Sequence, residues 1–179
     1  MIKWHRDIWE IFADIILEEA ICIPTNGYVK SNGQAVMGRG VAKQATRRIP
    51  GIQKILGKAI VQNGNIVQVV YPGVIAFPTK PAFGVCALDK SNVVSHWRDN
   101  AKSGQGVPGW AMLSDLALIS ASLDQLEELQ QEKGWGRVYL PRPGCGAGGL
   151  DWEKQVRPLC EQTGDWLIVV TRPSRDVLL

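Results

Sequence analysis

The sequence of 179 residues has few of the residues that build metal sites or disulfide frameworks. Its four cysteines include no pair at C-x-x-C spacing, so neither a zinc site nor a disulfide pattern is indicated. Its two histidines, His5 and His96, have no partner at metal-ligand spacing, and each is typical of a structural or surface residue. We therefore expect neither a metal nor a cofactor.

Long apolar runs and long charged runs are also missing. The N-terminus carries His5, Arg6 and Asp7 before any apolar stretch, which is unlike a signal peptide. No apolar run approaches the roughly 18 residues that span a bilayer. No basic run is long enough to indicate a nucleic-acid-binding tail, and the net charge of +3 is mild but compatible with an anionic ligand. These absences favour a cytoplasmic protein without a membrane partner.

What the sequence does contain is typical of one globular domain. Hydrophobic residues make up 45% and charged residues 21% of the chain. No repeat or linker divides it, so we expect a single domain over residues 1–179, with a monomer as the default expectation. Residues 82–108 are rich in glycine, serine, asparagine and aspartate. They predict an irregular excursion, with a short helix near residues 93–97 as an option, of the kind that often serves as a lid or a binding loop.

Hydrophobic periodicity predicts strands that alternate with helices. The expected strands cover residues 20–24, 66–71, 74–77, 138–140 and 166–171. The expected helices cover residues 8–17, 41–48, 52–58 and 113–133, with a last helix from about residue 153 that Pro158 forces to begin late or to kink. The alternation favours an α/β fold in which helices cover both faces of a central sheet.

Two glycine-rich segments stand where expected strands give way to helices. The longer one reads Leu-Pro-Arg-Pro-Gly-Cys-Gly-Ala-Gly-Gly-Leu-Asp-Trp over residues 140–152, and the shorter one reads Val-Met-Gly-Arg-Gly over 36–40. Glycine lets the backbone approach a ligand closely, and free N–H groups at a helix start favour an anion. A tight loop without a ligand explains either segment alone. Together, the two segments predict a site that binds one diphosphate from opposite sides.

Other nucleotide-binding and hydrolytic motifs fit poorly. Gly144, Gly146 and Gly149 spell G-x-G-x-x-G, but that fingerprint requires an acidic residue about 20 positions further on, where this chain has Val169. No glycine is followed by Lys-Ser or Lys-Thr at P-loop spacing. No Ser-His-Asp set or glycosidase-like pair of carboxylates stands out.

Polar residues gather after the expected strands, at the edge of the sheet where ligands of α/β proteins bind. Thr25 and Asn26 follow the first strand, and Lys80 stands between two prolines after residues 74–77. A single lysine is most often a surface residue. The prolines nevertheless hold this backbone stiffly, which suits a catalytic ammonium or a phosphate clamp.

Segments 36–42, 77–80 and 141–152 resemble, in sequence and in order, the motifs of macrodomains, and the resemblance covers about residues 14–171. It is closest to the branch that contains the DNA ADP-ribosyl glycohydrolase antitoxins (DarG-like proteins) and the terminal ADP-ribose glycohydrolase. The resemblance implies a three-layer α/β/α fold with a mixed central sheet and a cleft for ADP-ribose.

The resemblance also implies roles for individual residues. Lys80 would act at the distal ribose, by attack or by stabilising charge. Asn32, which matches the family's asparagine when counted back from Gly38, would orient the ribose hydroxyls. The expected ligand-binding residues are Asp14, Ile15, Thr171 and Arg172 at the adenine, Thr25, Asn26, Val36, Met37, Gly38, Arg39 and Gly40 around the first glycine-rich segment, and Pro143, Gly144, Cys145, Gly146, Ala147, Gly148 and Gly149 over the phosphates.

The chain departs from the family pattern at two positions. Pro24 stands where the family has its first asparagine, with Asn26 as either its substitute or the cap of a turn, and Gly148 stands where the terminal ADP-ribose glycohydrolase has an acidic residue. Asp151 matches the Gly-Leu-Asp-Trp of the DNA-directed branch but is equally typical of a helix N-cap. The resemblance predicts a hydrolase that removes ADP-ribose from nucleic acid, protein or a small molecule. An ADP-ribose 1″-phosphate phosphatase and a non-catalytic ADP-ribose reader are the alternatives.

Overall fold

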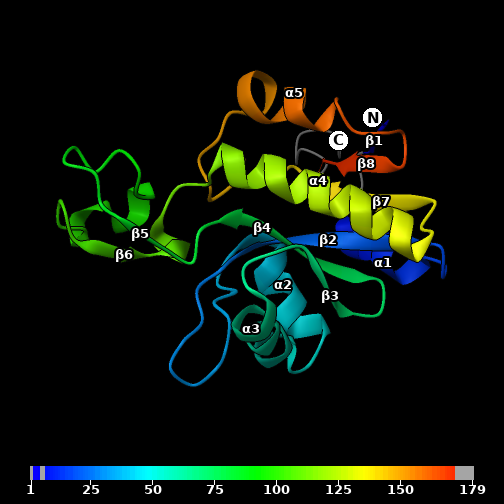
Figure 1. Cartoon of the computed structure of the whole chain (residues 1–179), viewed down its shortest axis with the longest axis horizontal. Coiled ribbons are helices and arrows are strands. Elements are labelled where there is room, and N and C mark those ends of the chain that lie inside the picture. The colour runs from blue at the N-terminus through cyan, green and yellow to red at the C-terminus, as the bar shows by residue number, and fades with distance from the viewer. Residues whose placement is uncertain (1, 5–6, 172–179) are drawn as a thin grey trace, which may run out of the picture.

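A computed structural model describes residues 2–4 and 7–171 (Figure 1). Its centre is a six-stranded sheet with the strand order β1-β8-β7-β2-β4-β3. Neighbouring strands are parallel except β3, which runs antiparallel to β4, so the sheet is mixed as expected. The strands are β1 (Ile2–Trp4), β2 (Glu19–Asn26), β3 (Gln68–Tyr71), β4 (Val74–Lys80), β7 (Arg137–Pro141) and β8 (Leu167–Val170).

Helices cover both faces of this sheet, which confirms the three-layer α/β/α prediction (Figure 1). Side chains of β2 alternate between the two cores: Ile21 and Ile23 pack toward one layer of helices, and Ala20 and Cys22 toward the other. The first layer consists of α1 (Ile8–Asp14), α2 (Gly40–Arg48) and α3 (Ile52–Asn63). The second consists of α4 (Leu116–Lys133), the π-helical turn η3 (Trp152–Val156) and α5 (Arg157–Cys160).

Local chemistry explains where the helices of the second layer begin. Helix α4 starts three residues later than expected, because the carboxylate of Asp115 accepts hydrogen bonds from the N–H groups of Ala117 and Leu118 and so caps it. Pro158 lies in the first turn of α5, where N–H groups have no partner within the helix, so its lack of an N–H costs no helical hydrogen bond. The late start predicted from Pro158 is confirmed.

Two features differ from the sequence expectations. Strand β1 was not expected, since three residues are too short to show a periodicity. The expected irregular excursion is structured: it contains an antiparallel pair, β5 (Phe83–Val85) and β6 (Gly106–Pro108), and two 3₁₀-helices, η1 (Ser95–Asn100) and η2 (Gly109–Ala111). Of these elements, only a short helix near residues 93–97, which overlaps η1, was expected. We call residues 82–112 the arm.

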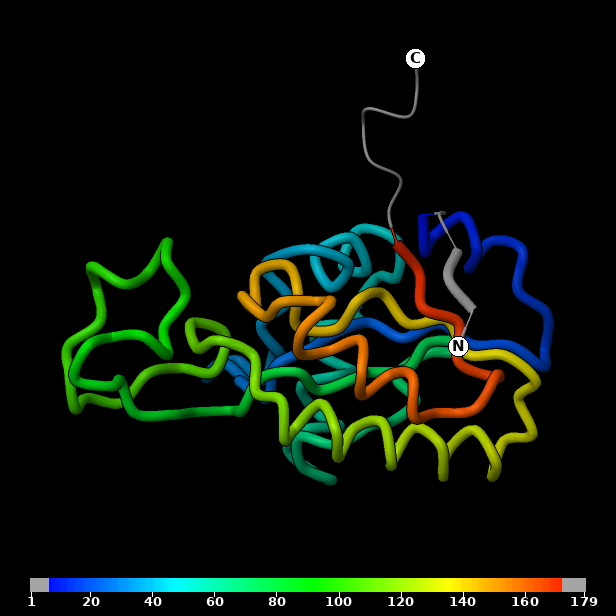
Figure 2. The backbone as a smooth tube through the Cα atoms, turned by 90° about the horizontal axis from the view of Figure 1, so that it is seen from above, coloured from blue at the N-terminus to red at the C-terminus, as the bar shows by residue number. Residues whose placement is uncertain are grey.

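The arm extends from the end of β4, away from the body of the molecule, as both views show (Figures 1 and 2). It has an apolar cluster of its own, formed by Cys86, Val93, Ala101, Val107, Ala111 and Met112. No helix in the described part of the chain is long and apolar enough to cross a bilayer.

Helix α3 supports the loop that leads from β2 to α2. The N–H of Ala35 donates to the carbonyl of Gln53 at 2.9 Å, and a Cβ on Gly57 would lie only 2.1 Å from the carbonyl oxygen of Gly33. Only glycine at position 57 therefore allows the loop to lie this close to the helix.

We expect the substitution Gly57→Ala to destabilise the protein by about 1–3 kcal/mol, because the added methyl overpacks the contact between helix and loop. In an open helix the same change stabilises by about 1 kcal/mol, so the sign of the effect is diagnostic. Urea unfolding measures it. Lys58→Ala, an exposed neighbour on the same helix, serves as control and should stay within about 0.5 kcal/mol of wild type. A gain in stability for Gly57→Ala would contradict the close approach.

Candidate ligand-binding cleft

A cleft of about 520 Å³ opens at the edge of the sheet where the parallel strands β2, β4 and β7 end. Its volume falls in the range of small-molecule sites, and its position is the one expected for ligands of α/β sheets. Its walls come from the ends of these strands, the two glycine-rich segments and the arm. The lining residues are Pro24, Thr25, Asn26, Val36, Met37, Gly38, Arg39, Gly40, Val41, Ala42, Thr79, Lys80, His96, Trp110, Ser114, Pro141, Arg142, Gly144, Gly146, Ala147 and Gly148.

The first wall is the segment 36–40, which leads into α2. The side chain of Asn26 fixes this segment, since its Nδ2 donates to the carbonyl of Val36 at 2.8 Å and its Oδ1 accepts from the N–H of Tyr28 at 3.0 Å. Arg39 is the N-cap residue of α2 and lines the cleft, so the positive end of the helix dipole and a guanidinium lie on the same wall.

The opposite wall is the segment that follows β7. A Cβ on Gly148 would lie 2.1 Å from Oγ of Ser114 and 2.3 Å from the carbonyl oxygen of Gly144, so glycine is required there by packing. The N–H of Ser114 donates to the carbonyl of Gly148 at 2.9 Å. Oγ of Ser114 is buried and has no hydrogen-bond partner among the described residues, which leaves a polar group of the cleft for a ligand or a water.

Lys80 lies at the end of β4, between these two walls and directly beside Asn26 of β2. Only 9% of its surface is exposed. Its Nζ donates to the carbonyl of Ala147 at 3.1 Å and to the carbonyl of Trp110, in the arm, at 3.3 Å. Burial, and then the charge of Arg39, lower the pKa of Lys80 to about 8.

The cleft carries positive charge and no carboxylate. Arg39, Lys80 and Arg142 line it, and all of its lining residues belong to the described part of the chain. The guanidinium of Arg142 lies 4.9 Å from the ring centre of Trp152, and its Nε is buried without a partner in the described structure. Such a site favours an anionic ligand.

The structure brings together most of the residues expected at the ligand. Thr25, Asn26, Val36, Met37, Gly38, Arg39, Gly40, Lys80, Gly144, Gly146, Ala147 and Gly148 all line the cleft. Pro143, Cys145 and Gly149 belong to the same segment but do not line it. The thiol of Cys145 donates to the carbonyl of Pro143 at 3.4 Å, and burial raises its pKa to about 11.

Asn32 is not brought to the cleft. It lies in an exposed turn, where its Oδ1 accepts from the N–H of Gln34 at 3.1 Å and its Nδ2 donates to Oε1 of Gln34 at 3.2 Å. Residues 27–35 form a loop outside the cleft, and counting back from Gly38 ignores that loop. The asparagine that lies beside Lys80 is Asn26.

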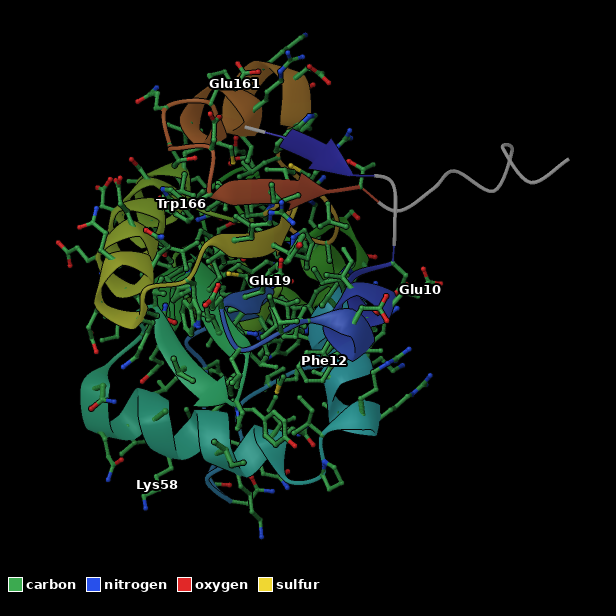
Figure 3. The ribbon with its side chains drawn as sticks, turned by 90° about the vertical axis from the view of Figure 1, so that its right-hand side faces the viewer. Glu10, Phe12, Glu19, Lys58, Glu161 and Trp166 are labelled. Carbon is green, nitrogen blue, oxygen red and sulfur yellow. The ribbon has the colours of Figure 1, made fainter. Side chains whose placement is uncertain are left out.

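Asp14 and Ile15 lie at the wrong edge of the sheet for a contact in the cleft. Helix α1 starts at Ile8, beyond the end of β1, and its seven residues carry the chain about 10 Å back toward the start of β2. Ile15 instead lines a groove with Phe12 and Glu19. Figure 3 shows Phe12 and Glu19 on the side of the molecule away from the arm. The residue that follows β1 at the cleft edge is Asp7, whose Oδ1 caps α1 by accepting from the N–H of Trp9.

Of the remaining candidates, Thr171 and Asp151 do not line the cleft. Thr171 follows β8 at the same edge of the sheet, and Arg172 lies outside the described residues. Asp151 is a helix N-cap, as its Oδ1 accepts from the N–H of Lys154 at 2.8 Å.

Nine residues of the cleft lining were not among the expected site residues: Pro24, Val41, Ala42, Thr79, His96, Trp110, Ser114, Pro141 and Arg142. Arg142 could have been found, because it stands within the longer glycine-rich segment. Ser114 directly precedes the cap of α4, a position at the cleft edge in an α/β fold. No sequence signal indicates His96 or Trp110, whose place depends on how the arm folds.

Comparison with known proteins found no matching family model and no similar curated sequence. Solved structures do match. The macrodomain of Mycobacterium tuberculosis DarG superimposes with a TM-score of 0.63 at 26% identity, over 97% of this chain and 99% of that one. The macrodomain of Thermus aquaticus DarG gives 0.61 at 20% identity, over 96% and 97% of the two chains.

A third match is Thermosipho africanus DarTG in complex with ADP-ribose. It has a TM-score of 0.54 and 16% identity over 90% of this chain and 40% of that one. The fold, the order of the motifs and the DarG matches agree with one another: this chain has the macrodomain fold and is similar to the macrodomains of the DarG-like branch.

Proposed function

We propose that the cleft binds ADP-ribose and that the protein hydrolyses an ADP-ribosyl linkage at C1″ of the distal ribose. The observation that carries the proposal is the buried ammonium of Lys80, held between two glycine-rich walls in a cleft without a carboxylate. The acceptor released would be a nucleic-acid base, a protein side chain or a small molecule. The described residues would act as one domain, with the arm as its appendage.

The geometry of the walls supports the ligand assignment. A diphosphate lying between the segments 36–40 and 144–148 would meet backbone N–H groups, the start of α2 and the guanidinium of Arg39. The hydroxyl of Ser114 would supply a further hydrogen bond. Thermosipho africanus DarTG, of which this chain matches 40%, was solved in complex with ADP-ribose, and this agrees with the assignment.

The strand order of the sheet suggests where the two ends of ADP-ribose would lie. The adenosine would extend along the carboxyl edge toward β8 and β1, where Asp7 and Thr171 lie. Asp7 would take the adenine contact expected of Asp14. The distal ribose would lie at Lys80, with Asn26 beside it in the place expected of Asn32.

Lys80 would act as an ammonium in this reaction. Two backbone carbonyls accept from its Nζ, and carbonyl acceptors favour the protonated form. A preorganised cation next to C1″ stabilises negative charge that develops on the leaving atom. Attack by the free amine is the alternative role, and the pH dependence below separates the two.

A non-catalytic reader is the second candidate function. It is favoured by one observation, the absence of a carboxylate from the cleft lining, because such a group would be the ordinary partner for acid–base chemistry. A reader would bind ADP-ribose and release nothing.

The first test compares wild type with Lys80→Ala and Lys80→Arg on ADP-ribosylated DNA, ADP-ribosylated protein and ADP-ribose 1″-phosphate. We expect wild type to release ADP-ribose from at least one of them, and Lys80→Ala to lose about 10²–10³-fold in kcat. Lys80→Arg should keep a measurable rate, because it keeps the charge. Chromatography of released ADP-ribose measures all three.

Calorimetry with ADP-ribose provides the control for folding and binding. Binding by wild type without release from any substrate would establish the reader and rule out the hydrolase. Turnover only of ADP-ribose 1″-phosphate would make the protein a phosphatase. Equal rates for wild type and Lys80→Ala would show that the lysine takes no part in the reaction. A wild type that does not bind ADP-ribose would refute the assignment of ADP-ribose as the ligand.

The pH dependence of kcat tests which form of Lys80 works. With the pKa of Lys80 near 8, an ammonium is lost as the pH rises through that value, so we expect kcat to fall above about pH 8. Lys80→Arg remains charged and should show no such fall. An increase of kcat through pH 8 would show that the free amine attacks.

Two substitutions of Asp151 distinguish a helix-capping role of its carboxylate from a catalytic role. We expect Asp151→Ala to lower the free energy of unfolding by about 1 kcal/mol, because the N–H of Lys154 loses its acceptor. Asp151→Asn keeps a capping oxygen, so its free energy of unfolding should fall by only a few tenths of a kcal/mol. Both variants should turn over substrate within about twofold of wild type, since small surface changes away from a site leave it intact. A large loss of turnover in Asp151→Asn would place the carboxylate in the chemistry.

A further inference from the structure

The arm is held rigidly against the cleft. A Cβ on Gly109 would lie 1.7 Å from the carbonyl oxygen of Pro81, and the N–H of Gly109 donates to the carbonyl of Ala82, so the two ends of the arm are clamped together beside Lys80. Trp97 of η1 and Trp110 of η2 pack edge to face with ring centres 5.6 Å apart. Together with the arm's apolar cluster, these contacts fix η1 and η2 relative to the end of β4.

Two residues of the arm line the cleft, Trp110 from η2 and His96 from η1. The side chain of His96 is exposed, so it lies at the mouth of the cleft where water has access. The groups that face it from other elements are Arg39 at the start of α2 and Lys80 at the end of β4, and Arg142 also lines the cleft. On its own helix stand Arg98 and Asp99.

These surroundings set the protonation state of His96. Partial burial, and then the charges of Arg39 and Lys80, lower the pKa of the imidazole below its ordinary value. At neutral pH the ring is therefore uncharged, with one nitrogen free to accept a proton. The described lining contains no carboxylate, so His96 is the side chain in it that can serve as a base near neutral pH.

We propose that His96 is the general base that activates the hydrolytic water, with the arm as the element that holds it over the cleft. This inference rests on the proposed hydrolysis at C1″. It assigns the base to the arm, outside the glycine-rich segments and strand ends that form the rest of the site.

Water gives one proton to the free nitrogen of His96 while its oxygen bonds to C1″. The bond from C1″ to the acceptor breaks, the electron pair stays on the acceptor atom, and the ammonium of Lys80 stabilises the negative charge on that atom. His96 then passes its proton through solvent to the acceptor atom. Burial and neighbouring positive charges lower the pKa values of both groups, so that at neutral pH Lys80, with a pKa near 8, is the ammonium and His96 is the base.

The test uses His96→Gln and His96→Ala, with Ser95→Ala as the matched control. Ser95 is the exposed neighbour on η1 and does not line the cleft. On the substrate that wild type turns over, we expect His96→Gln to lose about 10²-fold or more in kcat and to lose the acidic limb of the pH profile. Binding of ADP-ribose by calorimetry should stay within about twofold, and Ser95→Ala should match wild type.

Rescue provides a second readout that a structural role would not give. Imidazole added to His96→Ala should restore part of the rate, and it should restore none to Lys80→Ala. Turnover by His96→Gln within about threefold of wild type, with the acidic limb retained, would overturn the assignment of His96 and leave the hydrolase standing. Wild type that binds ADP-ribose but releases none from any substrate would overturn both.

Discussion

Most of this site depends on one constraint, the burial of the Lys80 ammonium at the end of a fully buried strand. Moving its pKa from the ordinary 10.5 to about 8 corresponds to about 3 kcal/mol against the charged form. Two carbonyl groups partly compensate, one from the segment after β7 and one from the arm. A single cation therefore joins three parts of the chain that are far apart in sequence.

The distribution of charge divides the work of the cleft. Arginine and lysine side chains lie on several walls of the cleft, and its lining, all of it within the described residues, contains no aspartate or glutamate. This charge suits a diphosphate, but it leaves the site without the carboxylate that glycosidic hydrolysis ordinarily uses. Binding and chemistry are consequently supplied by different parts of the fold. The glycine-rich walls offer backbone donors, while the two groups with lowered pKa values, Lys80 and His96, come from the strand end and the arm.

Much of the fold could be predicted from the sequence because its signals are local. The alternation of apolar segments gave the layers, and the glycine-rich segments and Lys80 marked the correct edge of the sheet. A resemblance along the sequence assigned the roles of Asn32 and Asp14, Asn32 by its distance from Gly38, but neither residue lines the cleft. Counting cannot show that residues 27–35 loop away from the site, or that a three-residue strand before α1 puts Asp7 at the cleft edge.

The arm carries His96 and Trp110, the two cleft residues that no sequence signal indicated. Its composition is that of a loop, yet β5 and β6 pair and an apolar cluster fills the space beside them. Trp110 follows Gly109, the residue whose missing side chain lets the ends of the arm meet, and the carbonyl of Trp110 accepts from Lys80. The clamp thus fixes a partner of Lys80 and the helix that carries His96 together. A movement of the arm would change the surroundings of both groups at once, so the arm belongs to the site.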